Sequence, residues 1–270
     1  MIRNATTERG LSDRLVELAR AMRFRGKVRL ATRFTPCKGL MLARVFGQEL
    51  ELDLSNFVDR MIYMGCYEPL NTHRFKRLLR PGMVVVDVGA NIGYFTLLAA
   101  SLVGQSGQVF AVEPWPENFA ILERAIKRNS LVQVRSFQFG LGGEPGVGQI
   151  SQADQSVFNN RTASMAGATG ISVSVRPLDD CITDWGLKRI DLLKIDVDGY
   201  ETQILEGALR AFRNRVIRNV IIELNEFWLS KANSSPAAVR SALLAAGFRD
   251  LTRSQRLAAF LLGPVDDRHF

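Results

Sequence analysis

Apolar residues recur in five short runs from residue 83 onward. Each run is rich in Val, Ile and Leu, as expected for strands that are buried on both faces of a parallel sheet. The five predicted strands are "MVVVDV" (83–88), "QVFAVEP" (108–114), "VQVRSFQFG" (132–140), "IDLLKIDVDG" (190–199) and "NVIIELNE" (219–226). Helical spacing and capping residues predict helices between these strands over 94–104, 116–129 and 200–212, and one after the last strand over 235–247. This alternation predicts an α/β fold, a mostly parallel sheet with helices on both faces.

Both ends of the chain depart from this rhythm. A capped amphipathic helix is predicted over 12–24, and two extended runs over 39–54 predict a β-hairpin. We therefore expect residues 1–72 to form an N-terminal helix and hairpin appendage, and residues 73–270 to form the main domain. Residues 248–263 predict an antiparallel hairpin that closes the sheet.

The composition describes a globular chain. Of 270 residues, 47% are hydrophobic, which suffices for a sizeable core. Its longest apolar runs fall well short of the ~20 residues that span a membrane. The first residues lack the apolar core of a secretory signal, and the three cysteines form neither a disulfide framework nor a metal-binding pair. These features predict a cytoplasmic protein, and they say nothing of its oligomeric state.

The net charge of +8 is concentrated near the N-terminus. Residues 1–33 contain nine Lys or Arg against three Asp or Glu. Such a segment can attract an anionic substrate, a lipid surface or nucleic acid. Phe24 is the single aromatic residue among these charges, too few for the stacking of successive bases in single-strand binders, so we do not expect nucleic acid. A solvated helix face is the simplest interpretation, and contact with a membrane surface is the alternative.

The first predicted strand runs into "DVGANIG" (87–93). Glycines at a strand-to-helix turn permit a tight turn and a close approach of the backbone to a ligand. The G-x-G-x-x-G spacing of dinucleotide-binding proteins is absent, which argues against a nicotinamide dehydrogenase. The second strand ends at Glu113, where a carboxylate can accept hydrogen bonds from both hydroxyls of a ribose. Together these residues predict a nucleoside-containing cofactor without a pyrophosphate.

Six stretches carry a resemblance to a known family. They are "GCYEP" (65–69), "PGMVVVDVGANIGYFTLLAA" (81–100), "VFAVEPWPENFAILERAIKRN" (109–129), "SVSVRPLDD" (172–180), "IDLLKIDVDGYETQILEGA" (190–208) and "VIIEL" (220–224). In these stretches the chain resembles the FkbM family of class I S-adenosylmethionine-dependent methyltransferases. The resemblance implies a Rossmann-like seven-stranded sheet and O-methylation of a hydroxyl on a small molecule, sugar or glycolipid. Asp198 departs from the family pattern, which has Glu in that position.

The resemblance also implies a cofactor site. The loop from Gly89 to Gly93 would pack on the methionine part of S-adenosylmethionine, and Glu113 on the ribose. Glu68, in "GCYEP", would come back over the site from the appendage as part of a lid. The other residues expected at the cofactor are Asp87, Ala90, Asn91, Tyr94, Gly140, Leu141 and Asp196.

The acids of the last two parallel strands are the candidates for chemistry. Methyl transfer to a hydroxyl requires an aligned oxygen and a group that removes its proton. Asp196 is our first candidate for that role, and Glu201 and Glu223 are the other catalytic candidates. Asp198 and Glu201 have an equally plausible role in favouring a helix N-terminus.

Two mechanistic alternatives stay open. Asp196, Asp198 and Glu223 offer oxygen ligands that suit Mg²⁺, so a metal is possible, although we do not expect one. His73 can serve as a base, but a solvated histidine on a helix is the simpler interpretation.

Two other functions compete with small-molecule methylation. An RNA methyltransferase would explain the basic N-terminus, yet the chain lacks an N-P-P-Y-type signature after the fourth parallel strand. A non-catalytic protein that binds S-adenosylmethionine would also retain the fold, but the acidic and glycine positions are intact. We expect acceptor specificity to lie in residues 1–72, in residues 141–176 and in the loop after the fifth strand.

Overall fold

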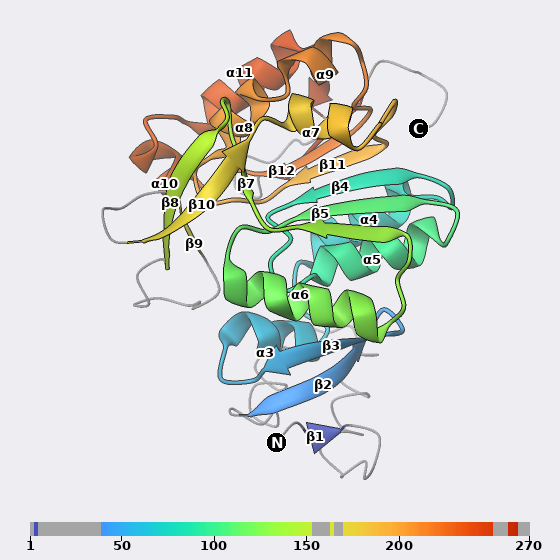
Figure 1. Ribbon diagram of the computed structural model, residues 1–270. Helices are drawn as coiled ribbons and strands as arrows, with labels where there is room; N and C mark the ends of the chain where they lie inside the picture. The colour runs from blue at the N-terminus through green and yellow to red at the C-terminus, as the bar shows by residue number, and fades with distance from the viewer. Residues whose placement is uncertain (1–2, 5–38, 153–162, 165–169, 251–258, 264–270) are drawn as a thin grey trace.

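A seven-stranded sheet forms the centre of the molecule (Figure 1). The computed structural model describes residues 3–4, 39–152, 163–164, 170–250 and 259–263. The sheet has the order β13-β14-β12-β11-β4-β5-β6. Its strands are β4 (Val84–Val88), β5 (Gln108–Val112), β6 (Val134–Phe137), β11 (Leu192–Ile195), β12 (Val220–Glu223), β13 (Arg249–Asp250) and β14 (Ala259–Gly263). The five predicted strands are confirmed and pair in parallel, which makes the fold Rossmann-like.

The predicted C-terminal hairpin is also present in the described part of the chain. Strand β14 pairs antiparallel with both β12 and β13. The direction of the chain across the sheet reverses at β4, which lies between β5 and β11. In open α/β sheets such a reversal opens a crevice at the carboxyl ends of the strands. The sheet order therefore directs attention to the segments that follow β4, β5, β11 and β12.

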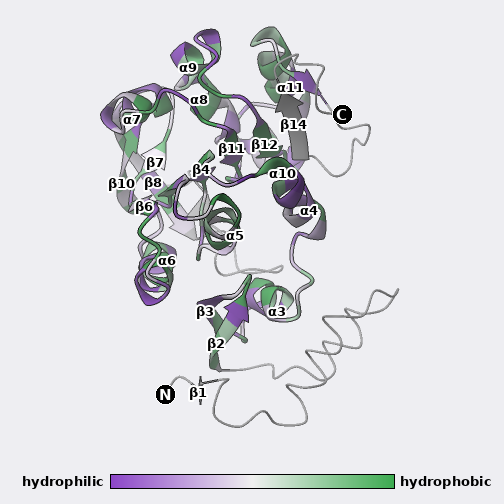
Figure 2. Ribbon diagram, turned by 90° about the vertical axis from the view of Figure 1, so that its right-hand side faces the viewer, coloured by the Kyte–Doolittle hydropathy of each residue, from purple (hydrophilic) through white to green (hydrophobic). Residues whose placement is uncertain are grey.

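Helices cover both faces of this sheet (Figure 1). They are α5 (Tyr94–Val103) and α6 (Pro116–Arg128) on one face, and α7 (Leu178–Asp184), α8 (Glu201–Glu206), α9 (Leu209–Arg213) and α11 (Pro236–Ala245) on the other, with α10 (Glu226–Lys231) after β12. Two clusters of buried apolar side chains fill the two interfaces. The central strands and α5 are correspondingly hydrophobic, while α6 contains both hydrophilic and hydrophobic residues (Figure 2).

One predicted helix is divided in two. The sequence pattern over 200–212 predicts a single helix, whereas α8 ends at Glu206 and α9 begins at Leu209. A Cβ atom on Gly207 would lie 2.0 Å from the carbonyl oxygen of Gly142. The backbone therefore breaks where it packs against the loop after β7, a tertiary contact that periodicity does not report.

A second, smaller sheet flanks the main one. Its strands are β7 (Gly140–Leu141), β8 (Gly146–Gln152), β9 (Ala163–Ser164) and β10 (Ile171–Arg176), in the order β7-β10-β8-β9. Strands β8 and β10 pair antiparallel. Strands β8, β9 and β10 lie within residues 141–176, one of the segments in which we expect acceptor specificity.

The predicted N-terminal hairpin is confirmed and packs on the main domain. It consists of β2 (Leu40–Val45) and β3 (Gln48–Asp53), with β1 (Arg3–Asn4) beside β2, and is followed by α3 (Phe57–Tyr63) and α4 (Pro69–Leu78). Glu51 forms ion pairs with Arg124 and Arg128 of α6 at 2.8 and 2.9 Å. The helix predicted over 12–24 and most of the basic N-terminal segment lie outside the described residues. No helix in the described part of the chain is both long and apolar enough to span a bilayer.

Candidate active site

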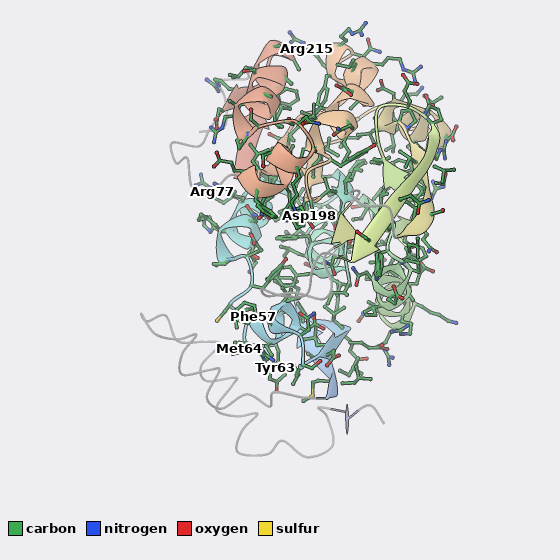
Figure 3. The ribbon with its side chains drawn as sticks, turned by 90° about the vertical axis from the view of Figure 1, so that its left-hand side faces the viewer. Phe57, Tyr63, Met64, Arg77, Asp198 and Arg215 are labelled. Atoms are coloured by element: carbon green, nitrogen blue, oxygen red, sulfur yellow. The ribbon has the colours of Figure 1, made fainter. Side chains whose placement is uncertain are left out.

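A cavity of about 220 Å³ opens at the carboxyl ends of the parallel strands, between the main sheet and the appendage. It is lined by Val58, Ile62, Tyr67, Glu68, Gly89, Ala90, Asn91, Ile92, Tyr94, Phe95, Glu113, Pro114, Asn118, Lys194, Asp196, Val197, Asp198 and Glu223. Asp198 marks its position near the middle of the molecule, between the C-terminal helices and the appendage that carries Phe57 and Met64 (Figure 3). The sheet thus brings together most of the residues singled out from the sequence.

The glycine loop approaches the neighbouring strand so closely that no side chain fits. Gly89 has φ +71°, and a Cβ atom on it would lie 1.9 Å from the carbonyl oxygen of Asp196. The amides of Gly89 and Ala90 both donate to the carbonyl of Val112, which ties the loop to β5. A cradle of bare backbone therefore forms between the ends of β4, β5 and β11, as a bound ligand would require.

Glu113 is held at the rim of this cradle. Its side chain is only 5% exposed, and its two oxygens accept hydrogen bonds from the amides of Asn91 and Trp115 at 2.7 and 2.9 Å. Burial raises the pKa of Glu113 to about 7, although the two amide bonds oppose the shift. Each oxygen retains a lone pair, so the carboxylate can still accept a ribose hydroxyl. The residues present therefore fit the nucleoside part of S-adenosylmethionine.

Asp87 does not reach the cavity. Its carboxylate is fully buried, accepts a 2.6 Å hydrogen bond from Thr96, and lies 3.0 Å from Nζ of Lys194. Lys194 and Asp87 are direct neighbours in the register of β11 and β4. Asp87 thus contacts a cofactor site only through Lys194, which does line the cavity.

Lys194 is the residue that our sequence reasoning missed. It lies within the otherwise apolar run "LLKI" of β11 and is almost fully buried. Its ammonium group also lies 3.3 Å from Asp196 and donates to the carbonyl of Gly89 at 3.0 Å. A buried charge requires such partners. A lysine within a strand that the sequence predicts to be buried on both faces therefore indicates a functional or paired residue, and this signal could have identified Lys194.

Four carboxyl groups crowd the other end of the cavity. Glu223 lies beside Asp196, since Ile195 and Ile222 are neighbours in the register of β11 and β12, and the charge of Asp196 is the main cause that raises the pKa of Glu223. Burial, followed by the same charge, raises the pKa of Asp198 to about 7 and also raises that of Glu68. Neighbouring carboxyl groups resist joint ionisation, because their negative charges repel each other. Asp198 and Glu223 therefore hold protons near neutral pH, as groups that exchange protons with a substrate must.

The appendage contributes a wall to this site. Glu68 has φ +42°, an unusual conformation for a residue other than glycine, and its carboxylate accepts a 2.8 Å hydrogen bond from Asn71. The ring of Tyr67 packs edge-on against Tyr94 with 5.0 Å between centroids, and burial raises the pKa of Tyr67 well above its ordinary value. Tyr67 thus offers a neutral phenol to the cavity. Whether this wall opens and closes as a lid remains a prediction.

Several sequence candidates lie away from the cavity. Glu201 is fully buried and its Oε1 accepts from the amide of Gly199 at 3.4 Å, at the start of α8. This position matches the helix N-terminus alternative rather than contact with a substrate. Gly140 and Leu141 form β7 beside β10, and Gly93 caps α5 without lining the cavity.

A metal ion has little support from the donor set. In the part of the chain that the structure describes, no group of three His, Cys, Asp or Glu side chains is arranged to hold one. The ammonium of Lys194 lies beside Asp196, where a divalent ion on the same carboxylate would meet a like charge.

Comparison with known proteins places this geometry in a family. The Methyltransferase FkbM domain matches residues 87–249. The chain is 34% identical over 178 residues to the 31-O-demethyl-FK506 methyltransferase FkbM of Streptomyces tacrolimicus, covering 55% of this chain and 67% of that one. It is 32% identical over 163 residues to Methyltransferase 1 of Beauveria bassiana, covering 52% and 64%. The matches thus span about two thirds of each relative.

A solved structure is similar at a lower level. The structure of the methyltransferase FkbM from Methylobacillus flagellatus KT aligns with a TM-score of 0.45 and 18% identity, covering 77% of this chain and 55% of that one. The family match, together with the nucleoside cradle at the reversal of the sheet, leads to one conclusion: the chain belongs to the FkbM family of S-adenosylmethionine-dependent methyltransferases.

Proposed function

We propose that the protein transfers a methyl group from S-adenosylmethionine to a hydroxyl oxygen of a small molecule or saccharide. The observation that carries this proposal is the pairing of Asp196 with Glu223 beside the glycine cradle. An alcohol must lose its proton as the new bond forms, and a carboxylate beside the donor's methyl group supplies the base. A relative whose name specifies a 31-O-demethyl acceptor supports oxygen as the receiving atom.

Each residue has a role in this proposal. The bare backbone at Gly89 and the carboxylate of Glu113 hold the cofactor, and Tyr67 and Glu68 face the cofactor and the acceptor from the appendage. Asp196 accepts the hydroxyl proton, and Glu223 donates a hydrogen bond to it. These groups converge from β4, β5, β11, β12 and the loop before α4, so the folded chain supplies orientation at little further entropic cost.

The bond changes balance without any other reactant. S-adenosylmethionine supplies, when bound, a methyl group on a positively charged sulfur. The acceptor oxygen forms a bond to that carbon, the carbon–sulfur bond breaks with its electrons passing to sulfur, and the hydroxyl proton passes to Asp196. The positive charge is lost from sulfur as the proton is taken up by the carboxylate, so the acidic lining of the cavity suits the charge of the donor.

The test is to incubate the protein with methyl-labelled S-adenosylmethionine and a panel of acceptors. The panel contains polyols, hydroxylated macrocycles, sugar acids, amine analogues of each and an RNA. We expect label in a methyl ether, detected by carbon NMR of the product. Label on nitrogen or on RNA would overturn the proposal, and so would failure of every hydroxyl acceptor while the protein binds S-adenosylhomocysteine and methylates another class.

Replacement of the proposed base sharpens the test. Asp196→Asn should lower kcat/KM by about 10²–10⁴-fold, the usual contribution of a positioned base. Asp180→Asn is the matched control, because Asp180 lies outside the cavity and pairs with Arg210 at 2.6 Å. It should leave the rate within a factor of about two. Equal rates for the two variants would exclude Asp196 as the base.

A further inference from the structure

The ammonium of Lys194 is surrounded by carboxylates and carbonyl oxygens within the site. It forms ion pairs with Asp87 at 3.0 Å and Asp196 at 3.3 Å, and it donates to the carbonyl oxygens of Gly89 at 3.0 Å and Val88 at 3.5 Å. The ring of Phe95 lies 5.3 Å from Nζ and covers the side of the group. Lys194 therefore joins the end of β4, the glycine cradle and the acid after β11 through one atom.

A purely structural lysine would need only part of this arrangement. Asp87 is fully buried and would suffice to neutralise the charge. Lys194 has in addition a second carboxylate partner, Asp196, whose side chain is 30% exposed and lines the cavity together with Lys194 itself. The second contact fixes the orientation of a carboxylate that faces the proposed acceptor.

The same contact decides how the acid pair shares its proton. Asp196 lies between a cation, Lys194, and a second acid, Glu223. A cation at this distance stabilises the ionised form of the nearer carboxyl group. Among the residues that the structure describes, the other charged groups near Lys194 are Glu68, Glu113 and Asp87, all of them acids.

We propose that Lys194 is a positioning residue that keeps Asp196 ionised and oriented toward the acceptor hydroxyl, with the proton of the Asp196–Glu223 pair on Glu223. This inference rests on the proposed transfer to a hydroxyl. In support, Asp87 and Asp196 together raise the pKa of Lys194 although burial alone would lower it, so the ammonium stays charged through the neutral range. Burial of a lysine lowers stability, and the orientation of Asp196 is a functional reason for Lys194 to be buried here.

The first test compares pH profiles. In Lys194→Met the acid limb of kcat/KM should move to higher pH by about 1–3 units, because the ionised pair loses its cation. Lys194→Arg retains the charge and should keep the limb within a few tenths of a unit. Arg189→Met is the matched control, since it removes a cation 3.0 Å from another buried aspartate, Asp191, outside the cavity. It should lower stability without moving the limb.

The second test needs neither turnover nor a Lys194 variant. The infrared difference between the wild type and Glu223→Gln, both without cofactor at pH 7, should show loss of a protonated carboxyl band. Loss of an ionised carboxylate band instead would overturn the inference, and so would an unmoved acid limb in folded Lys194→Met. Methylation of nitrogen by the wild type would refute the proposed function alone, because the infrared result would stand.

Discussion

The acids at the two ends of strand β11, Asp191 and Asp196, have opposite surroundings. At the amino end, Asp191 is 3% exposed and accepts hydrogen bonds from the amide of Val84 at 2.9 Å and from Arg189 at 3.0 Å, with Arg218 at 3.4 Å. At the carboxyl end, Asp196 lies 3.3 Å from Lys194 and shares a cavity with the acids Glu68, Asp198 and Glu223. Donors surround the first carboxylate, whereas competitors for protons surround the second.

The difference separates acids that hold a fold from acids that can do chemistry. An acid whose oxygens are saturated by fixed donors stays ionised and contributes stability. An acid that borders a cavity has an oxygen that a substrate can reach, and its carboxyl neighbours, here Asp198 and Glu223, have raised pKa values. Asp191 and Asp196 have the same side chain, so the groups around each carboxylate determine its role.

The largest expected effect concerns the backbone at the carboxyl end. Gly89 and Gly186 have nearly equal φ angles, +71° and +70°, but a Cβ atom would lie 1.9 Å from Asp196 O in the first and has nothing within 4 Å in the second. Gly186→Ala should therefore cost only about 1–2 kcal/mol of unfolding free energy, the left-handed penalty. Gly89→Ala should cost at least about 2 kcal/mol more and abolish binding of S-adenosylhomocysteine.

Urea unfolding and calorimetry measure both quantities on both variants. The pair shares a backbone conformation, so any difference reports the close contact with the end of β11. Equal losses of stability, or intact binding by Gly89→Ala, would show that the glycine is required for its φ angle alone.

The sequence predicted the parallel strands well because each is a short apolar run of its own. The sequence did not predict the register between the strands, because register depends on contacts between distant segments. That register makes Lys194 the neighbour of Asp87 and Ile195 the neighbour of Ile222, which places Asp196 beside Glu223. The sequence therefore identified the acids but missed the lysine that joins them.

Other candidates also occupy positions that their place in the chain does not reveal. Glu201 lies shortly after β11 and is one of the catalytic candidates from the sequence. In the structure it lies in the first turn of α8, where its side chain is buried in the core. Gly140 and Leu141 follow β6, but they pair with β10 in the smaller sheet. Proximity along the chain to a strand end does not by itself place a side chain in the crevice.

The next effect tests the amino end of β11. Asp191→Asn removes the charge that Arg189 and Arg218 share and weakens the bond from Val84. The unfolding free energy should fall by about 1.5–3 kcal/mol, the range for hydrogen bonds to charged groups. The rate per folded molecule should stay within a factor of about two, in contrast to Asp196→Asn. A loss of rate beyond the loss of folded protein would erase the distinction between the two ends.

The smallest expected effect concerns Glu201, a buried acid that, within the described part of the chain, neither pairs with a cation as Asp191 does nor lines the cavity as Asp196 does. Burial raises the pKa of Glu201 from 4.5 to about 8. Between those values the folded state binds a proton that the unfolded state has released, so this residue makes stability fall as pH rises. The slope is at most about 1.4 kcal/mol per pH unit. From pH 6 to 7, Glu201→Gln should thus gain roughly 1 kcal/mol relative to the wild type, measured by urea unfolding, whereas Glu206→Gln, at an exposed position of the same helix, should not. A parallel slope in the wild type and Glu201→Gln would mean that Glu201 is already ionised in the fold, which would place it with the saturated acids of the amino end.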